Sequence, residues 1–268
     1  MKVVYHNIEN FGDGSNDKAK LSWISQLVDR NDVVFLSEVM QTGEVLLQDL
    51  ISKHKWYSMR CLYDYSHQIY VVSKRIRLTP EINAIPIDEA PMIPRGVQDR
   101  FVGVWANRCL LIGVHLKSTS LKESVRFSGS FLNEQRQRSR AVFTISEALR
   151  RHTRSPAIVL GDFNSVHNDN GILELLVGNT MMRAALGKVH KDLDHAFFNE
   201  NVLIESARLV PSDLSSHASI LLTFQMKLQR PTRIHFNPRK RKRWSPKKKP
   251  EERGPTVVHQ FVKRLVNI

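Results

Sequence analysis

The chain is poor in cysteine and has no long uninterrupted apolar segment. Cys61 and Cys109 are its two cysteines, and they form neither a disulfide framework nor the spacing of a metal site. A transmembrane helix needs about 18 or more consecutive apolar residues, and no segment approaches that length. The first residues also lack the apolar segment and cleavage site of a signal peptide. We therefore expect no membrane partner and an intracellular location, cytoplasmic or, in a eukaryotic host, nuclear.

Acidic residues are also scarce, with 26 Asp and Glu against 40 Lys and Arg, which leaves a net charge of +14. The excess is uneven, because residues 231–268 hold twelve Lys or Arg and only two Glu, and so carry +10 of it. A chain of 268 residues with 41% hydrophobic content favours one main domain. We expect a globular domain over residues 1–228 and a basic tail over residues 229–268.

The composition of the tail predicts that most of it forms no core of its own, because it combines high charge with repeated prolines. Its basic runs are typical of a nuclear-localisation signal or of a patch that binds nucleic-acid phosphates, with the tryptophan stacking on a base. Val258, Phe261, Val262 and Leu265 recur at helical spacing and predict a short amphipathic helix that would dock on this or another protein. The tail residues expected to contact nucleic acid are Lys240, Arg241, Lys242, Arg243, Trp244, Lys247, Lys248 and Lys249.

Strand-like segments dominate the first 226 residues, with helical patterns near residues 18–29, 44–53, 133–151 and 171–177. The strands follow one another without regular helical crossovers, which favours antiparallel or mixed sheets over a doubly wound parallel sheet. We therefore expect an α/β fold, a four-layer α/β/β/α sandwich of two mixed, mostly antiparallel sheets flanked by helices. The predicted strands cover residues 2–8, 32–39, 56–65, 68–73, 102–105, 110–116, 157–160, 194–198, 204–210 and 218–224.

One stretch, from Ala157 to Asn164, combines a buried strand with polar residues at its end. The apolar run is followed by Gly161, and then by Asp162 and Asn164, which face the same side of an extended chain. In isolation this pattern is better explained as a plain strand-to-loop turn, because Asp and Asn hydrogen-bond to their own backbone. Polar residues stand at several other predicted strand ends, which favours a shared site: Asn7, Glu38, His115, Asp194 and, after Ser215-Ser216, His217.

In order and residue type these positions resemble the endonuclease/exonuclease/phosphatase family, the DNase I-like metal-dependent phosphoesterases. The likeness extends over residues 1–226 and leaves out the tail. It implies the sandwich fold and hydrolysis of phosphoesters with a bound Mg²⁺, or Mn²⁺ in its place. The segments that carry it are Asn7, Phe35-Leu36-Ser37-Glu38-Val39, Val114-His115-Leu116-Lys117-Ser118, Gly161-Asp162-Phe163-Asn164, Leu193-Asp194-His195 and His217.

The resemblance places the metal at Glu38, because a hard cation prefers oxygen ligands and retains waters. Asn7 would lie nearby, either as an amide oxygen ligand or as an orienting donor. Two departures concern this region. The family has an aspartate where this chain has Ser216. It also has a further acid between the Glu38 strand and His115, which has no counterpart that we can place in this chain, where His67 and Gln68 fall in that region.

The resemblance also implies the catalytic roles. His217 would be the general base, with Asp194 fixing its tautomer. Asp162 and Asn164 would orient the nucleophilic water and the scissile phosphate. His115 would bind phosphate or donate a proton, although a histidine on an apolar strand is also a common core residue.

A basic series follows the His115 strand, and its function stays open. Arg136, Arg138 and Arg140 on the predicted long helix are typical of a solvated face. Lys117, Arg136 and Arg140 are nevertheless candidates for contact with nucleic-acid phosphates.

Three function classes fit the sequence. A Mg²⁺-dependent endonuclease that nicks DNA is favoured by the two-histidine site and the basic tail. A phosphatase acting on phosphoinositides or nucleotides would use the same fold. A non-catalytic nucleic-acid-binding protein is disfavoured, because the polar strand-end residues are retained, with Ser216 as the exception.

Overall fold

The computed structural model describes residues 1–14, 16–61, 68–87, 100–116, 129–165, 172–186 and 193–227. The chain divides into two units, Met1–Gln229 and Arg230–Ile268. The second unit lies outside the described residues, and so does the helix predicted around Phe261. The basic tail and its contacts therefore stay a prediction from the sequence.

The described part of the first unit contains thirteen strands and four helices. The helices are α1 (Asp17–Arg30), α2 (Gln41–His54), α3 (Gly129–Arg151) and α4 (Ile172–Thr180). The strands are β1 (Lys2–Phe11), β2 (Val33–Val39), β3 (Tyr57–Cys61), β4 (Gln68–Ser73), β5 (Leu78–Ile82), β6 (Ala84–Pro86), β7 (Phe101–Ala106), β8 (Cys109–His115), β9 (Ala157–Asp162), β10 (Arg183–Ala184), β11 (Asp194–Phe198), β12 (Val202–Val210) and β13 (Ser219–Met226).

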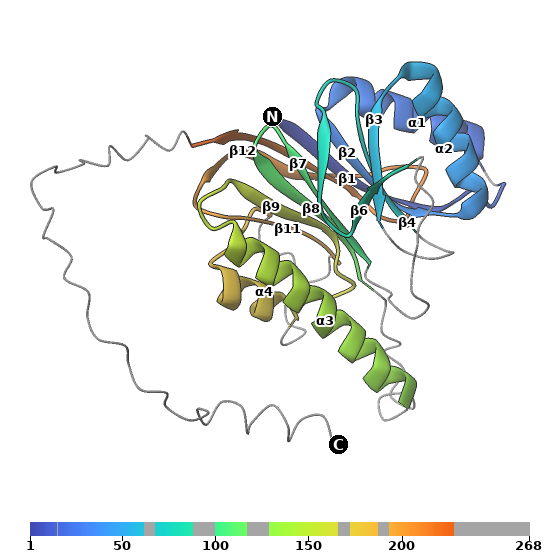
Figure 1. Cartoon of the computed structure of the whole chain (residues 1–268). Helices are drawn as coiled ribbons and strands as arrows, with labels where there is room; N and C mark the ends of the chain where they lie inside the picture. Colours follow the sequence, from blue (N-terminus) through green and yellow to red (C-terminus); the bar gives the residue numbers. More distant parts are fainter. Residues whose placement is uncertain are drawn as a thin grey trace, which may run out of the picture. The chain divides into compact units, whose positions relative to one another are not determined.

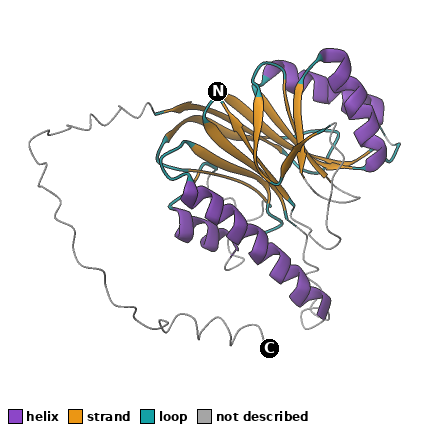
Figure 2. Cartoon of the chain, in the orientation of Figure 1, coloured by secondary structure: helices purple, strands orange, loops and turns teal. Residues whose placement is uncertain are grey.

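Two β-sheets face each other, and helices cover the outer face of each (Figure 1). A seven-stranded sheet has the order β12-β13-β1-β2-β4-β3-β6, and a six-stranded sheet has the order β10-β11-β9-β8-β7-β5. Figure 2 shows the strands enclosed between two groups of helices. The four-layer α/β/β/α sandwich predicted from the sequence is confirmed.

Three apolar clusters lie between the four layers and hold them together. The first fills the space between the sheets and includes Phe35 from one and Leu160 from the other. The second packs the six-stranded sheet against α3 and α4, and the third packs the seven-stranded sheet against α1 and α2. The central strands are buried on both faces, which explains why they read as continuous apolar runs in the sequence. None of the described helices is long and apolar enough to cross a lipid bilayer.

Each sheet contains one parallel pair joined by a helix. β1 and β2 are parallel and connected through α1, and β8 and β9 are parallel and connected through α3. The remaining described pairs are antiparallel. In a parallel pair both carboxyl ends lie at the same edge, so polar residues in the carboxyl-terminal halves of these four strands are brought together.

Sequence patterns missed three strands, β5, β6 and β10. β5 and β6 are edge strands that contain Pro80 and Pro86, and proline normally argues against a strand. An edge strand tolerates proline because one side of its backbone needs no sheet partner. β10 is only two residues long, too short for a periodic pattern.

Gly113 in β8 tests how tightly the sheets pack. A Cβ atom at this position would lie 2.3 Å from Cδ1 of Phe35 in the opposite sheet. We expect Gly113→Ala to lower the free energy of unfolding by about 1–3 kcal/mol, as overpacking of a core does. Urea denaturation measures this change in the free energy of unfolding. The control is Gly178→Ala in α4, where a Cβ meets nothing within 4 Å and where alanine should stabilise the helix by about 0.5–1 kcal/mol. Equal effects of the two substitutions would contradict the packing argument.

Candidate active site

Polar residues meet at one end of the core between the sheets. In β9, Ile158 and Leu160 belong to that core, and Asp162 is the next residue on the same face. The strand register pairs Asp162 with His115 of β8 on one side and with Asp194 of β11 on the other. Three of the predicted site residues are therefore neighbours in one sheet.

The seven-stranded sheet contributes Asn7 and Glu38. The pairing of β2 with β4 shifts register between Leu36 and Val39, and Glu38 there has a left-handed φ of 60°. Such a bulge changes the direction of a side chain. The Glu38 carboxylate accepts hydrogen bonds from Nδ2 of Asn7 at 2.9 Å and from the backbone N–H of Asn10 at 3.3 Å.

Asn7 links the two sheets. Its Nδ2 also lies 3.4 Å from Oδ2 of Asp162, and its Oδ1 accepts the backbone N–H of Glu9 at 3.1 Å. The amide nitrogen therefore faces the carboxylates, whereas the amide oxygen is engaged by the backbone. Of the two roles expected for Asn7, this geometry favours the orienting donor over the metal ligand.

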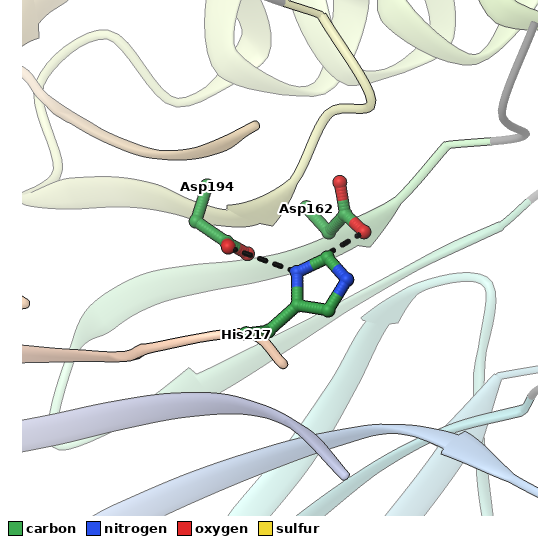
Figure 3. A group of neighbouring side chains, drawn as sticks. All are labelled: Asp162, Asp194 and His217. Atoms are coloured by element: carbon green, nitrogen blue, oxygen red, sulfur yellow. Dashed lines mark hydrogen bonds and ion pairs between the residues drawn. The ribbon is translucent and has the colours of Figure 1, made fainter. Parts of the chain in front are cut away.

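His217 lies between two acids (Figure 3). Its Nδ1 is 3.1 Å from Oδ2 of Asp194 and 3.9 Å from Oδ2 of Asp162. The backbone N–H of His217 donates to Oγ of Ser215 at 3.1 Å, which shapes the turn before β13. With Nδ1 donating to Asp194, Nε2 is the ring nitrogen that can accept a proton.

The acids and histidines shift one another's pKa values. Burial, and then the neighbouring Asp194 carboxylate, raise the pKa of Asp162 to about 6, although His115 and His217 act in the opposite direction. The hydrogen bond to Asp194 is the main reason why the pKa of His217 rises to about 9. Burial, and then the charges of Asp162 and Asp194, raise the pKa of Tyr5 well above its ordinary value.

His115 faces the acids, although only 3% of it is exposed. Its Nε2 lies 3.4 Å from Oε1 of Glu38 and 3.9 Å from Oδ2 of Asp162. A core histidine surrounded by apolar side chains would not have this environment. The position fits a group that contacts phosphate or donates a proton next to Glu38.

Asn164 shapes the loop that follows β9. Its backbone has a left-handed φ of 47°, and its N–H donates to Oδ1 of Asp162 at 2.8 Å. Its side-chain Nδ2 donates to the backbone oxygen of Leu116 at 2.7 Å. Asn164 therefore fixes the orientation of Asp162 and joins the loop to the end of β8.

The sequence profile of the Endonuclease/Exonuclease/phosphatase family matches residues 4–217. The chain belongs to this family. Its members are hydrolases that act on phosphoester bonds, and this is the general activity of the chain. Comparison with curated protein sequences gave no match.

Solved structures with the same fold include enzymes with different substrates. The 3' phosphatase NExo from Neisseria, bound to a product DNA hairpin, is 14% identical with a TM-score of 0.59, over 84% of this chain and 99% of that one. A humanized TDP2 of D. rerio is 17% identical, with a TM-score of 0.57, over 84% and 99% of the two chains. A mannosyl-6-phosphatase of Bacteroides thetaiotaomicron is 12% identical, with a TM-score of 0.54, over 84% and 100%.

Ser216 departs from the family pattern, and the structure places another acid beside it. The backbone N–H of Ser216 donates to Oε2 of Glu9 at 2.7 Å. Glu9 has a left-handed φ of 49°. Its backbone oxygen accepts a hydrogen bond from Nζ of the buried Lys20 at 2.8 Å. Sequence reasoning missed Glu9, and its place two residues after Asn7 is the signal that could have found it.

The expected basic contacts divide into exposed, buried and undescribed residues. Arg136 and Arg140 are exposed on α3, as a contact with phosphate requires. Arg138 is buried, so its assignment to a solvated helix face was wrong. Lys117 and the tail residues from Lys240 to Lys249 lie outside the described residues, and their roles stay predictions.

The donor groups fit a hard divalent cation. Carboxylates of Glu38, Asp162 and Asp194 converge on this end of the sandwich, and within the described ranges Oδ1 of Asp194 is buried with no hydrogen-bond partner. Asp162, Asp194 and His217 place three potential ligand atoms within 4.8 Å of one another. The raised pKa of His217 favours its protonated form, which is a poor metal ligand. Glu38 as the metal ligand stays a prediction from the sequence.

The pair of His217 and Asp194 can be tested by NMR titration without added metal. We expect a pKa of about 9 for His217. In Asp194→Asn it should fall towards the ordinary value of about 6.5, because the amide cannot stabilise the imidazolium ion. The pKa of His217 is higher in the folded protein than in the unfolded chain. The contribution of the His217–Asp194 pair to the stability of the fold is therefore complete below about pH 6.5, and it is lost as the pH rises through about 9. The control is Asp29→Asn, which removes a surface acid paired with Lys74. An unchanged His217 pKa in Asp194→Asn would contradict the pairing.

Proposed function

We propose that this chain is a Mg²⁺-dependent endonuclease that hydrolyses DNA phosphodiester bonds, nicking one strand at a time. The observation that carries the proposal is the arrangement of His217 against Asp194 and Asp162, with Glu38 and His115 beside them. This places a histidine paired with an acid next to a carboxylate that can hold a cation. Such an arrangement supports metal-assisted attack of water on a phosphoester.

The charge supports a polyanionic substrate. The net charge is +14, of which the last 38 residues carry +10, and counterion release favours binding of such a chain to nucleic acid. The Neisseria enzyme of the same fold is bound to a DNA hairpin, which supports DNA as the ligand, whereas the Bacteroides enzyme acts on a sugar phosphate. The fold therefore suits either class, and the charge favours DNA.

Mg²⁺, or Mn²⁺, would be held by Glu38, and would stabilise negative charge on the scissile phosphate and the leaving oxygen. Asn7 donates to the same carboxylate and so holds it in one orientation. His115, with Nε2 beside Glu38, would donate a hydrogen bond to a phosphate oxygen. Glu9, beside Ser216, keeps an acidic group near the position of the missing aspartate.

His217 would accept the proton of the attacking water at Nε2, while its Nδ1–H donates to Asp194. Asp162 would accept a hydrogen bond from the water and orient it. In the ion-free protein a pKa of about 9 keeps His217 protonated at neutral pH. Positive charge bound at Glu38 would lower that pKa, because Glu38 is one of the groups that raise it.

Substitution of Glu38 tests the metal. Glu38→Gln should lower the rate of plasmid nicking by at least about 10²-fold, because an amide supplies no ionic ligand. Isothermal titration calorimetry should show weaker Mg²⁺ binding, and circular dichroism an unchanged fold. Glu205→Gln, at an exposed acid on β12, is the matched control and should behave like the wild type. Full activity in excess EDTA would rule out the metal mechanism.

Removal of the tail separates a nuclease from a phosphatase for small molecules. A chain of residues 1–230 loses +10 of charge and none of the proposed catalytic groups. Its DNA affinity should fall strongly at low salt. Its salt dependence should be flatter, because log K changes by about 0.9 per neutralised phosphate for each tenfold change in salt. The rate of hydrolysis at saturating DNA should stay close to that of the full chain.

The measurement is DNA affinity at two salt concentrations for both chains, with hydrolysis of a mononucleotide and of an inositol phosphate in parallel. Equal salt slopes would show that the tail does not bind DNA. Preferential hydrolysis of a small phosphate would favour the phosphatase.

A further inference from the structure

Arg138 in α3 is the largest of the fully buried side chains of the described residues, and only 2% of it is exposed. Arg136 and Arg140, two positions to either side, are exposed. Buried arginines are rare unless their donors are bound, because a guanidinium ion loses its hydration on burial. The position therefore needs an explanation in terms of the groups that the guanidinium contacts.

Three hydrogen bonds join Arg138 to the loop that follows β9. Its Nη2 donates to the backbone oxygens of Phe163 at 3.3 Å and Asn164 at 3.2 Å, and also to Oγ of Ser165. The loop is held from a second side, because Nε2 of His195 in β11 is 2.7 Å from the backbone oxygen of Ser165. One cationic group thus binds three successive residues of the segment that carries Asp162 and Asn164.

Regular strand pairing of β9 ends at Asp162, where this loop begins. The N–H of Phe163 still donates to the backbone oxygen of Leu193 at 2.9 Å, whereas Asn164 is left-handed with a φ of 47°. Carbonyl groups of such a segment point away from any strand partner and must find other donors. The planar guanidinium can donate several hydrogen bonds in fixed directions, which suits carbonyls that belong to consecutive residues.

We propose that Arg138 is a positioning residue for catalysis, which holds the 163–165 backbone and thereby sets the orientation of Asp162 and Asn164. The link is short, because the N–H of Asn164 donates to Oδ1 of Asp162, and Nδ2 of Asn164 donates to Leu116. A shift of the Asn164 backbone would move the carboxylate that faces His217 and His115. The inference rests on the proposed function only in that these residues act on a phosphoester.

A purely structural role makes a different prediction. If Arg138 only contributed to stability, its variants would lower the midpoint of unfolding, and the molecules that stay folded would be fully active. A positioning role lowers kcat in the folded protein and leaves KM nearly unchanged, because the substrate-contacting surface is intact. Small displacements of reacting groups, of about 1 Å, can cost about 10²-fold in rate.

The experiment compares full-length Arg138→Ala and Arg138→Lys with Arg150→Ala. Arg150 lies on the same helix, is 44% exposed and pairs with Glu147, so its variant should match the wild type. Below the unfolding midpoint of each protein, kcat for plasmid nicking should fall by about 10²-fold in Arg138→Ala, with KM within a few-fold. Arg138→Lys should regain only part of the rate, because the lysine side chain ends one bond short of the Nη2 position and its ammonium group is more strongly hydrated. Added guanidinium at millimolar concentration should partly restore Arg138→Ala, whereas methylammonium should not.

Amide hydrogen exchange of Asn164, followed by NMR, reports on the loop without any substrate. In Arg138→Ala this amide should exchange faster than in the wild type, and in Arg150→Ala it should not. If the wild type does not cut DNA but Asn164 loses protection in Arg138→Ala, the nuclease proposal fails and the positioning role stands. If Arg138→Ala retains both the protection of Asn164 and the wild-type kcat, the positioning role is overturned. A lower kcat that guanidinium does not restore, with Asn164 still protected, overturns it as well.

Discussion

The rest of the site depends on the burial of Asp162 between the two sheets. Only 1% of this residue is exposed, and burial raises its pKa to about 6. A buried carboxylate is unfavourable unless donors and positive charges surround it. Nδ2 of Asn7, the backbone N–H of Asn164 and two histidines do so here, and they come from both sheets. The groups that stabilise this one charge are therefore the same groups to which the proposed mechanism gives roles.

The scaffold brings these groups together through a few irregular backbone positions on otherwise regular strands. The parallel pairs β1–β2 and β8–β9 place their carboxyl ends at the site, and a bulge turns Glu38 towards it. The loop after β9 is left-handed at Asn164 and is held by Arg138 from α3. Strained segments of this kind persist only where their surroundings determine them, which is common at functional sites.

The general activity and the substrate rest on different parts of the chain. Phosphoester hydrolysis follows from family membership, which rests on residues 4–217. The same fold serves a DNA-bound 3' phosphatase and a mannosyl-6-phosphatase, so the fold does not select the substrate. The proposal of a polyanionic substrate rests instead on the charge of the chain and on the exposed arginines of α3.

The layered fold was predictable from the sequence, because apolar runs marked the central strands. Local patterns alone favoured a plain turn at Asp162 and a core histidine at His115, and it was the order of polar residues along the whole chain that marked Asn7, Glu38, His115 and Asp162 as a candidate site. The burial of Arg138 was decided by tertiary structure, since helical spacing placed it among solvated arginines, whereas the β9 loop, distant in sequence, supplies acceptors for its guanidinium group. The contact of Glu9 with Ser216 joins residues 207 positions apart, and no local pattern records such a pair. Local periodicity encodes which face of a strand is apolar, whereas the partner of a polar group depends on which distant segments the fold brings beside it.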